Sequence, residues 1–455
     1  MTDTVSRITE TRVLADFASS LTLHSVPPEV GHRAKRALVD WFAATLAGST
    51  DPASAKLRAA VAAAGGDVTA TIVGSAQRTG APYAALVNGY SSHAVDFDDV
   101  FNPPETTVHL GSCVWPTVMA IAEIRPLSGA DALAAYLAGF EVGARVGRAA
   151  GVTHFESGWQ VTGTAGHLGA AAAAARALGL SGEATANALG MAASQASGVR
   201  ANYGTDAKAL QPGRAAMNGV LNGLMAECGM TAGAAAIEGQ RGLLSVISRD
   251  PDPAVLVESL GAEWDVLDNG HKLYPNASLL HPAVDAAVFI SDRPEFSCDA
   301  VEKVEVRMLP FAASVTSETD PGPGSEARFS AVHCVAYALR AGRLGIDSFE
   351  VAAVSDPEVR RLRDRVTVIP DDSVGKRGAR MRVTMRDGST IEHVVEANRG
   401  TPQNPMSDDD LDAKLRFTAV PLIGRDAADE LAEQCWKADT AERAGGILKA
   451  LGQPS

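Results

Sequence analysis

The stretch SGADALAAYLAGFEVGARVGR, residues 128–148, indicates the class of the fold. Ser128 and Asp131 have the spacing of a capping box, in which side chains satisfy the free amide groups at the start of a helix. Leu133 and Leu137 then place apolar side chains on one face of that helix. The stretch therefore predicts a helix that packs against a hydrophobic core.

Similar patterns fill the chain up to residue 270. They predict helices at 28–48, 82–95, 113–126, 167–180, 182–198 and 213–229. Several of these segments are rich in alanine and glycine, as in HLGAAAAAARALGL. Because small side chains let helices approach closely, we expect a tightly packed helical domain.

The pattern changes near Tyr274. Residues 301–308, VEKVEVRM, alternate apolar and charged side chains, which is typical of a half-buried strand. The segment 379–397, ARMRVTMRDGSTIEHVVEA, predicts a β-hairpin that turns at Asp387-Gly388. Another strand, RVTVI, ends just before Pro370.

Helices are expected between these strands, at 326–341 and 347–364, and again from Ser407 onward. The predicted fold is mainly α, with a large all-helical domain and an inserted smaller α/β (α+β) lid domain. We place the helical domain at 1–272 plus 403–455 and the lid at 273–402.

Composition and charge exclude several classes of protein. The chain is 46% hydrophobic and carries a net charge of −14, which argues against a general nucleic-acid binder but permits an anionic small substrate. Its five cysteines are scattered and form no CxxC pair, so neither a disulfide framework nor a zinc or iron–sulfur site is expected. With no signal-peptide pattern and no membrane span, we expect a soluble cytoplasmic protein.

The stretch 90–116, YSSHAVDFDDVFNPPETTVHLGSCVWP, is the most unusual in the chain. It holds Asp96, Asp98 and Asp99 within four residues and His109 shortly after them. Crowded carboxylates repel one another, which raises at least one pKa, and such a group beside a histidine suits proton transfer. A magnesium or manganese site and a solvated helix end are the alternatives.

Two further clusters combine cations with turns. In 199–214, Lys208 and Arg214 flank a turn that contains Pro212, where they could clamp carboxylates or form a solvated basic turn. The third cluster, 269–282, lies at the predicted domain junction; its members, which could equally be structural, are His271, Lys272, Tyr274 and His281.

Motifs in these clusters and beyond them run in a consistent order along the chain. They are HAVDFDD, the His109 region, GFEVGARVGRA, SGWQVTGTAGHLGAAAAAARALGL, YGTDAKALQPGRAAMNGV, KLYPNASLLHPAVDAA and EARFSAVHCVAYAL. Together they resemble the MmgE/PrpD family, which includes 2-methylcitrate dehydratases, cis-aconitate decarboxylases and iminodisuccinate epimerases. The resemblance implies a helical domain built from both chain ends, an inserted α/β lid, and a homodimer that acts on small polycarboxylates without metal or cofactor.

The resemblance also implies a set of site residues. The expected catalytic residues are Asp96, His109, Lys208 and His333. The expected substrate-binding residues are Gln160, Gln211, Arg214, Lys272 and His281. The cations would hold substrate carboxylates, His109 and His333 would transfer protons, and Asp96 would orient or tune His109.

Several positions depart from the family pattern. They are Val100, Leu110, Gln160, Gln211 and His333, where the family usually has threonine, proline, histidine, histidine and tyrosine. Glutamine can form hydrogen bonds but cannot exchange a proton, whereas histidine titrates nearer neutral pH than tyrosine does. The departures indicate a divergent member with its own substrate or reaction.

The predicted function is that of a lyase or isomerase acting at the carbon next to a carboxylate of a small polycarboxylic acid. Dehydration of a 2-methylcitrate-like acid comes first, because it is the commonest activity in the family. Epimerisation and decarboxylation of related acids are the alternatives within the family. A catalytically silent polycarboxylate binder and a metal-dependent hydrolase using Asp96, Asp98, Asp99 and His109 are the alternatives outside it.

Overall fold

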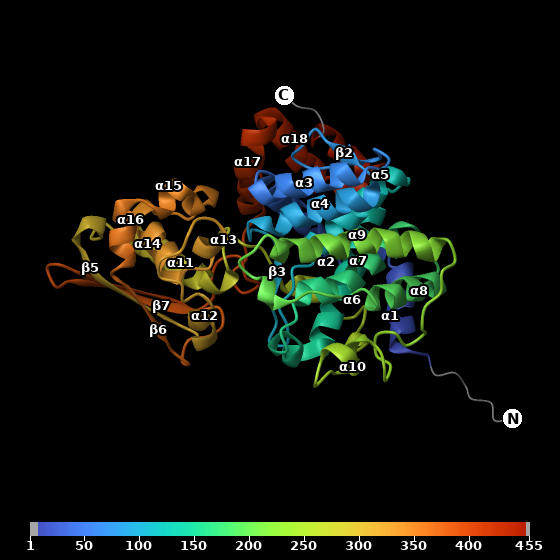
Figure 1. Ribbon diagram of the computed structural model, residues 1–455, viewed down its shortest axis with the longest axis horizontal. Coiled ribbons are helices and arrows are strands. Elements are labelled where there is room, and N and C mark those ends of the chain that lie inside the picture. The colour runs from blue at the N-terminus through green and yellow to red at the C-terminus, as the bar shows by residue number, and fades with distance from the viewer. Residues whose placement is uncertain (1–7, 452–455) are drawn as a thin grey trace. The chain divides into compact units, whose positions relative to one another are not determined.

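The computed structural model describes residues 8–451, and the chain divides into two compact units (Figure 1). The helical unit consists of Met1–Ala94, Asp98–Gly270 and Ser407–Ser455. The α/β unit consists of Val95–Phe97 and His271–Met406. The chain is mainly α with a smaller α/β part, which confirms the predicted fold class.

Helices account for most of the helical unit. They are α1 (Glu10–Ser20), α2 (Pro28–Ser49), α3 (Pro52–Ala64), α4 (Ala81–Ala94), α5 (Gly111–Ile124), α6 (Gly129–Glu156), α7 (Val161–Ala177), α8 (Gly182–Ala193), α9 (Ala207–Glu227), α10 (Leu243–Ile247), α17 (Asp408–Ile423) and α18 (Arg425–Trp436). The unit also contains two short antiparallel pairs of strands: β1 (Ala70–Thr71) with β2 (Arg78–Thr79), and β3 (Val100–Phe101) with β4 (Asn269–Gly270). The predicted helices are present, but α9 begins before Pro212 and not after it, because the helix accommodates that proline internally.

Close packing of α6 against α7 depends on glycine. A Cβ atom on Gly139 would lie 2.6 Å from the carbonyl oxygen of Gly169, and one on Gly169 would lie 2.7 Å from that of Gly139. Any larger side chain at this crossing would push the two helices apart. The small residues that the sequence shows in this region therefore allow the close approach.

The C-terminal helix α17 packs against α2, so the two ends of the chain build one unit (Figure 1). Ser407 and Asp410 form a capping box at the start of α17. One turn further, Lys414 Nζ lies 2.7 Å from Asp40 Oδ1 of α2, and both side chains are buried. This ion pair joins segments 374 residues apart in the sequence.

The α/β unit contains a four-stranded sheet in the order β6-β5-β7-β8. Its strands are β5 (Val301–Met308), β6 (Val366–Pro370), β7 (Ala379–Met385) and β8 (Thr390–Val395), and its helices are α11 (His281–Ser291), α12 (Pro310–Val315), α13 (Ser325–Arg328), α14 (Ala331–Ala341), α15 (Val351–Val354) and α16 (Pro357–Arg363). Strands β5 and β6 are parallel, and the other neighbours are antiparallel. The predicted hairpin and the other predicted strands are confirmed, with Gly388 in the left-handed conformation at φ +86°.

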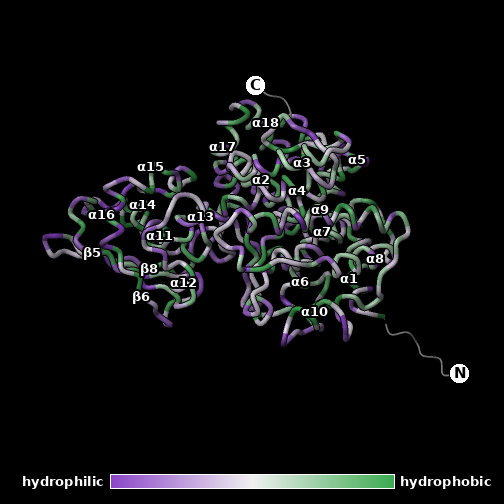
Figure 2. Tube along the Cα trace, viewed as in Figure 1, coloured by the Kyte–Doolittle hydropathy of each residue, from purple (hydrophilic) through white to green (hydrophobic). Residues whose placement is uncertain are grey.

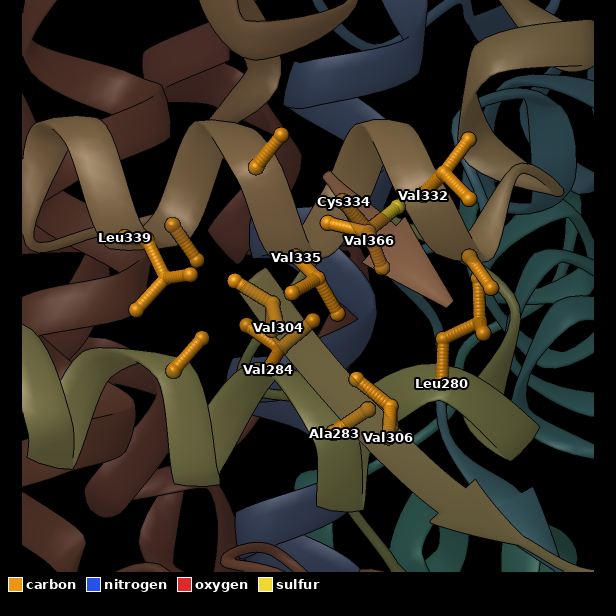
Figure 3. Close-up of a cluster of buried hydrophobic side chains, with 14 of the residues drawn as sticks. Leu280, Ala283, Val284, Val304, Val306, Val332, Cys334, Val335, Leu339 and Val366 are labelled. Carbon is orange, nitrogen blue, oxygen red and sulfur yellow. The ribbon is translucent and has the colours of Figure 1, made fainter. Parts of the chain in front are cut away.

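Apolar side chains from α11, α14 and β5 form the core of the α/β unit (Figure 3). Val304 and Val306 point from one face of β5 toward Val284 of α11 and Val335 of α14, and all four are fully buried. This alternation along β5 is the one that VEKVEVRM predicted.

Two helices predicted in this unit are each interrupted. The segment 326–341 divides into α13 and α14 because Ser330 caps a new helix by accepting a hydrogen bond from the His333 amide. The segment 347–364 divides into α15 and α16 because Pro357 starts a helix that Asp356 caps. Both interruptions arise from helix N-caps, which the spacing of apolar residues does not indicate.

Apolar and polar residues are mixed along the chain of both units (Figure 2). Among the described residues, we find no helix with both the length and the hydropathy needed to cross a bilayer. The sequence prediction about the start of the chain concerns in part residues 1–7, which lie outside the described residues.

The buried pair between α17 and α2 should be necessary for stability. Removing one member of a buried ion pair leaves the other charge in an apolar environment, which costs about 3–5 kcal/mol. We expect Lys414→Met to lower the free energy of unfolding, measured by urea denaturation, by about this amount. Lys437→Met is the matched control, because Lys437 forms an exposed pair with Glu433 on α18 and should change nothing measurable. Equal stability of the two variants would contradict a structural role for the buried pair.

Candidate active site

The loop before α5 holds His109 in a fixed orientation. The chain doubles back here, because β3 pairs with β4 and Phe101 also bridges to Val108. The His109 amide donates to Thr162 Oγ1 at 3.1 Å, and His109 Nδ1 lies 2.6 Å from the Asp99 carbonyl oxygen. A carbonyl can only accept, so Nδ1 carries a hydrogen and Nε2 is the nitrogen that can exchange a proton.

A buried carboxylate lies behind this imidazole. Asp98 Oδ2 accepts hydrogen bonds from His93 Nδ1 at 2.7 Å and from Ser112 Oγ at 2.7 Å. The same oxygen lies 3.6 Å from His109 Nδ1. The two histidine rings are 4.9 Å apart between centroids, at 60° to each other. Asp98 therefore links the two imidazoles.

The adjacent Asp99 binds the start of α5. Both its carboxyl oxygens lie 3.1 Å from the Gly111 amide, and Asn269 Nδ2 donates to Oδ2 at 2.9 Å. Burial raises the pKa of Asp99 to about 8, and repulsion from Asp98 and Asp40 adds to that effect. Asp99 therefore fixes the loop through two groups. Its carboxyl group binds the Gly111 amide and Asn269, and its backbone carbonyl binds His109.

Three side chains around His109 carry atoms that could bind a metal ion. One possible ligand atom from each of His93, Asp98 and His109 lies within 4.8 Å of the others. However, Nδ1 of each histidine donates a hydrogen bond, one to Asp98 and one to the Asp99 carbonyl. Nδ1 of each ring is therefore engaged in a hydrogen bond, and the three residues form a hydrogen-bonded network.

The two predicted glutamines hold a neighbouring segment. Gln160 Oε1 accepts from the Gly163 backbone amide and caps α7, while the backbone amide of Gln160 donates to the Gly198 carbonyl at 3.0 Å. Gln211 Nε2 donates to the Val199 carbonyl at 3.2 Å. Both side chains are buried. The Gln211 side chain and the Gln160 backbone position residues 198–199, and the role of the two side chains in substrate binding stays a prediction.

The predicted cations of α9 differ in exposure. Lys208 lies in the first turn and is buried, with Nζ 5.8 Å from the centroid of the Tyr203 ring. Arg214 lies two turns further along and is exposed. Lys208 is therefore buried next to an aromatic ring whereas Arg214 is exposed, and the role of each in binding a substrate carboxylate stays a prediction.

Other predicted site residues belong to the α/β unit. Lys272 Nζ donates to the Asp96 carbonyl at 3.1 Å and lies 3.7 Å from Asp96 Oδ1, and both residues are buried. Asp96 has φ +54°, a strained conformation for a residue with a side chain. His281 starts α11, with its ring edge-to-face against Tyr274 at 5.3 Å, and Tyr274 donates to Asp285 at 2.7 Å.

His333 lies on α14 beside the hydrophobic core of the α/β unit. Its side chain is fully buried, and Nε2 donates to the Ser348 carbonyl at 2.8 Å. Burial lowers the pKa of His333, and Arg363 lowers it further, although the hydrogen bond to Ser348 opposes them. This environment favours a neutral ring that packs in place, and its predicted role in proton transfer stays a prediction.

Some residues of this network were not singled out from the sequence. They are His93, Thr162, Ser112 and Asn269. His93 and Ser112 lie inside the 90–116 stretch, five residues before Asp98 and fourteen after it, so the motif itself contained the signal. Asn269 is the first residue of the third cluster, 269–282, but it lies 170 residues from Asp99, and no sequence pattern linked the two.

The raised pKa of Asp99 predicts a pH effect on stability. A carboxyl with a pKa of about 8 when folded, against 3.8 ordinarily, holds its proton at pH values where the unfolded chain has lost it. Its contribution to stability is therefore full below about pH 4 and disappears as the pH rises through 8. We expect Asp99→Asn to gain stability relative to wild type as the pH is raised from 5 to 8.5, measured by urea unfolding. The exposed control Asp67→Asn should run parallel to wild type, and parallel behaviour of both variants would contradict the prediction.

Comparison with known proteins covers nearly the whole chain. Residues 12–256 match the MmgE/PrpD N-terminal domain, and residues 274–438 match the MmgE/PrpD C-terminal domain. A cis-aconitate decarboxylase-like protein of Aspergillus oryzae is 28% identical over 99% of this chain and 99% of its own. The cis-aconitate decarboxylases of Homo sapiens (27% identical, 98% of this chain and 95% of the relative) and Aspergillus terreus (28%, 98% and 96%) are similar throughout.

Proposed function

Since the chain belongs to the MmgE/PrpD family, we propose that it is a cofactor-independent lyase that decarboxylates a small unsaturated tricarboxylic acid resembling cis-aconitate. The family predicted from the motifs is confirmed. The similar proteins carry the name of a decarboxylase, so decarboxylation takes precedence over the dehydration that the sequence placed first. The site observation that supports the proposal is His109, whose Nδ1 hydrogen is held by the Asp99 carbonyl so that Nε2 serves for proton transfer.

The reaction needs one proton and stabilisation of negative charge. The bond between a substrate carbon and its carboxylate breaks, CO₂ leaves, and the electron pair stays on the substrate as an allylic carbanion next to another carboxylate. His109, as an imidazolium, gives a proton from Nε2 to that carbon and becomes neutral. Lys208 binds a carboxylate that remains on the substrate, where its positive charge offsets the developing negative charge.

Proton NMR in D₂O with cis-aconitate tests the reaction directly. We expect a decarboxylated product with a single deuterium on the newly protonated carbon, and CO₂ appearing at the same rate. Citrate-like and aspartate-like acids run beside it separate the alternatives: loss of water indicates a dehydratase, and deuterium exchange without loss indicates an epimerase. A thermal shift with any of these acids but no turnover indicates a silent binder. The predicted homodimer and the roles of Asp96, Lys272 and His281 stay predictions.

His109→Gln should remove the proton donor while keeping a polar side chain of similar size. General acid catalysis contributes about 10²–10⁴-fold, so we expect kcat to fall by about that factor. His24→Gln is the control, because His24 is exposed, and it should leave the rate unchanged. Turnover by the His109 variant at the wild-type rate would assign proton transfer to another group.

Lys208→Met should weaken substrate binding more than any exposed lysine would. A hydrogen bond to a charged group contributes about 1.5–3 kcal/mol, which corresponds to a rise in KM of roughly 10- to 100-fold. The matched control is Lys56→Met, which removes an exposed lysine paired with Asp206 next to the same helix. Steady-state kinetics of both variants check this, and equal KM values would remove Lys208 from the substrate site.

A further inference from the structure

We propose that His93 is a positioning residue for the reaction: through Asp98 it keeps a correctly oriented, ionised carboxylate behind His109. This inference rests on the proposed role of His109 as the proton donor. His93 was not among the site residues predicted from the sequence. Its role follows from a buried hydrogen-bonded network that connects α4, the following loop and α5.

His93 occupies the last turn of α4, where its side chain is 0% exposed. Its Nδ1 donates to Asp98 Oδ2 at 2.7 Å. Its Nε2 is buried and makes no hydrogen bond with any described residue. Because a carboxylate oxygen can only accept, the hydrogen between the two groups belongs to His93 Nδ1, and His93 is the donor of this bond.

Asp98 receives two short hydrogen bonds on one oxygen. Ser112 Oγ donates to Oδ2 at 2.7 Å, the same distance as His93 Nδ1. Hydrogen bonds to a carboxylate favour its charged form, and two donors from different helices fix the direction in which Oδ2 points. This offsets the cost of burying Asp98 beside Asp99.

The carboxylate acts on His109 through charge. His109 Nδ1 already donates to the Asp99 carbonyl at 2.6 Å, and Asp98 Oδ2 lies 3.6 Å from the same nitrogen. A negative charge at this distance stabilises the imidazolium, which is the form that gives a proton to the substrate carbanion. Titratable residues that contact His109 from this unit include His93 through its ring, Asp98 through its carboxylate, Asp99 through its carbonyl and Cys113 through its thiol.

Two substitutions of His93 distinguish the effect of losing the hydrogen-bond donor from the effect of changing the shape of the side chain. In His93→Asn, the side-chain amide nitrogen lies close to the position of Nδ1 and can still donate to Asp98. In His93→Leu, the volume is largely kept but the donor is lost. We expect kcat to fall by about 10- to 100-fold in the leucine variant and by no more than a few-fold in the asparagine variant. Circular dichroism and thermal unfolding check that both variants fold.

A second measurement does not depend on turnover. Titration of protein with ¹³C- and ¹⁵N-labelled histidine, with the His109 signal assigned from His109→Gln, gives the pKa of His109 by NMR. Loss of the His93 donor favours the protonated, neutral form of Asp98, so we expect a lower His109 pKa in His93→Leu than in wild type and an unchanged one in His93→Asn. If His93→Leu does not fold, Ser112→Ala removes the other donor and should shift the pKa in the same direction.

The outcomes distinguish this inference from the proposed function. Absence of wild-type turnover with every acid would overturn the proposed function, and the NMR titration would still test the link between His93 and His109. Unchanged kcat and His109 pKa in His93→Leu would overturn the positioning role. Equal losses in the leucine and asparagine variants would also overturn it, because they would show that only the shape of the ring matters.

Discussion

Two adjacent carboxyl groups, Asp98 and Asp99, are buried in the turn between α4 and α5, and each needs hydrogen-bond donors. Asp98 finds them in His93 and Ser112, and Asp99 finds them in the Gly111 amide and Asn269. A buried acid without such partners would destabilise the turn by several kcal/mol. Meeting this requirement brings the end of α4, the start of α5 and strand β4 together, and His109 is held where they meet.

The same requirement extends to the ends of the chain. Asp40 on α2 is one of the two acids whose repulsion raises the pKa of Asp99, and Asp40 is paired with Lys414 of the C-terminal helix. Lys414 therefore contributes a positive charge where three acids would otherwise accumulate. After the α/β unit the chain returns to the helical unit, where α17 supplies the positive charge that pairs with the buried Asp40.

The sequence was informative where a feature is local. Apolar periodicity predicted the helices and strand β5, and the Asp387-Gly388 turn predicted the hairpin of β7 and β8. It failed where a capping side chain interrupts an apolar pattern, as Ser330 and Asp356 do. Motif reasoning likewise selected His109 but could not select Asn269, because their association depends on the pairing of β3 with β4 across more than 150 residues.

The residues of the helical unit also differ in how well they suit epimerisation, dehydration and decarboxylation. Epimerisation needs two proton carriers on opposite faces of a carbon, and dehydration needs a base for the C–H bond and an acid for the departing hydroxyl. Gln160 and Gln211 cannot carry protons; the Gln160 side chain caps α7, and the Gln211 side chain holds Val199.

Decarboxylation has the simplest requirement, because CO₂ leaves without a proton and the carbanion takes up one. Among the site residues predicted for the helical unit, His109 is the imidazole, and its Nε2 is the nitrogen suited to transfer that proton. A network that orients the imidazole of His109 and balances its charge is what such a one-proton reaction requires. The replacement of two expected histidines by glutamine is therefore compatible with decarboxylation, whereas it removes groups that the two-proton reactions would use.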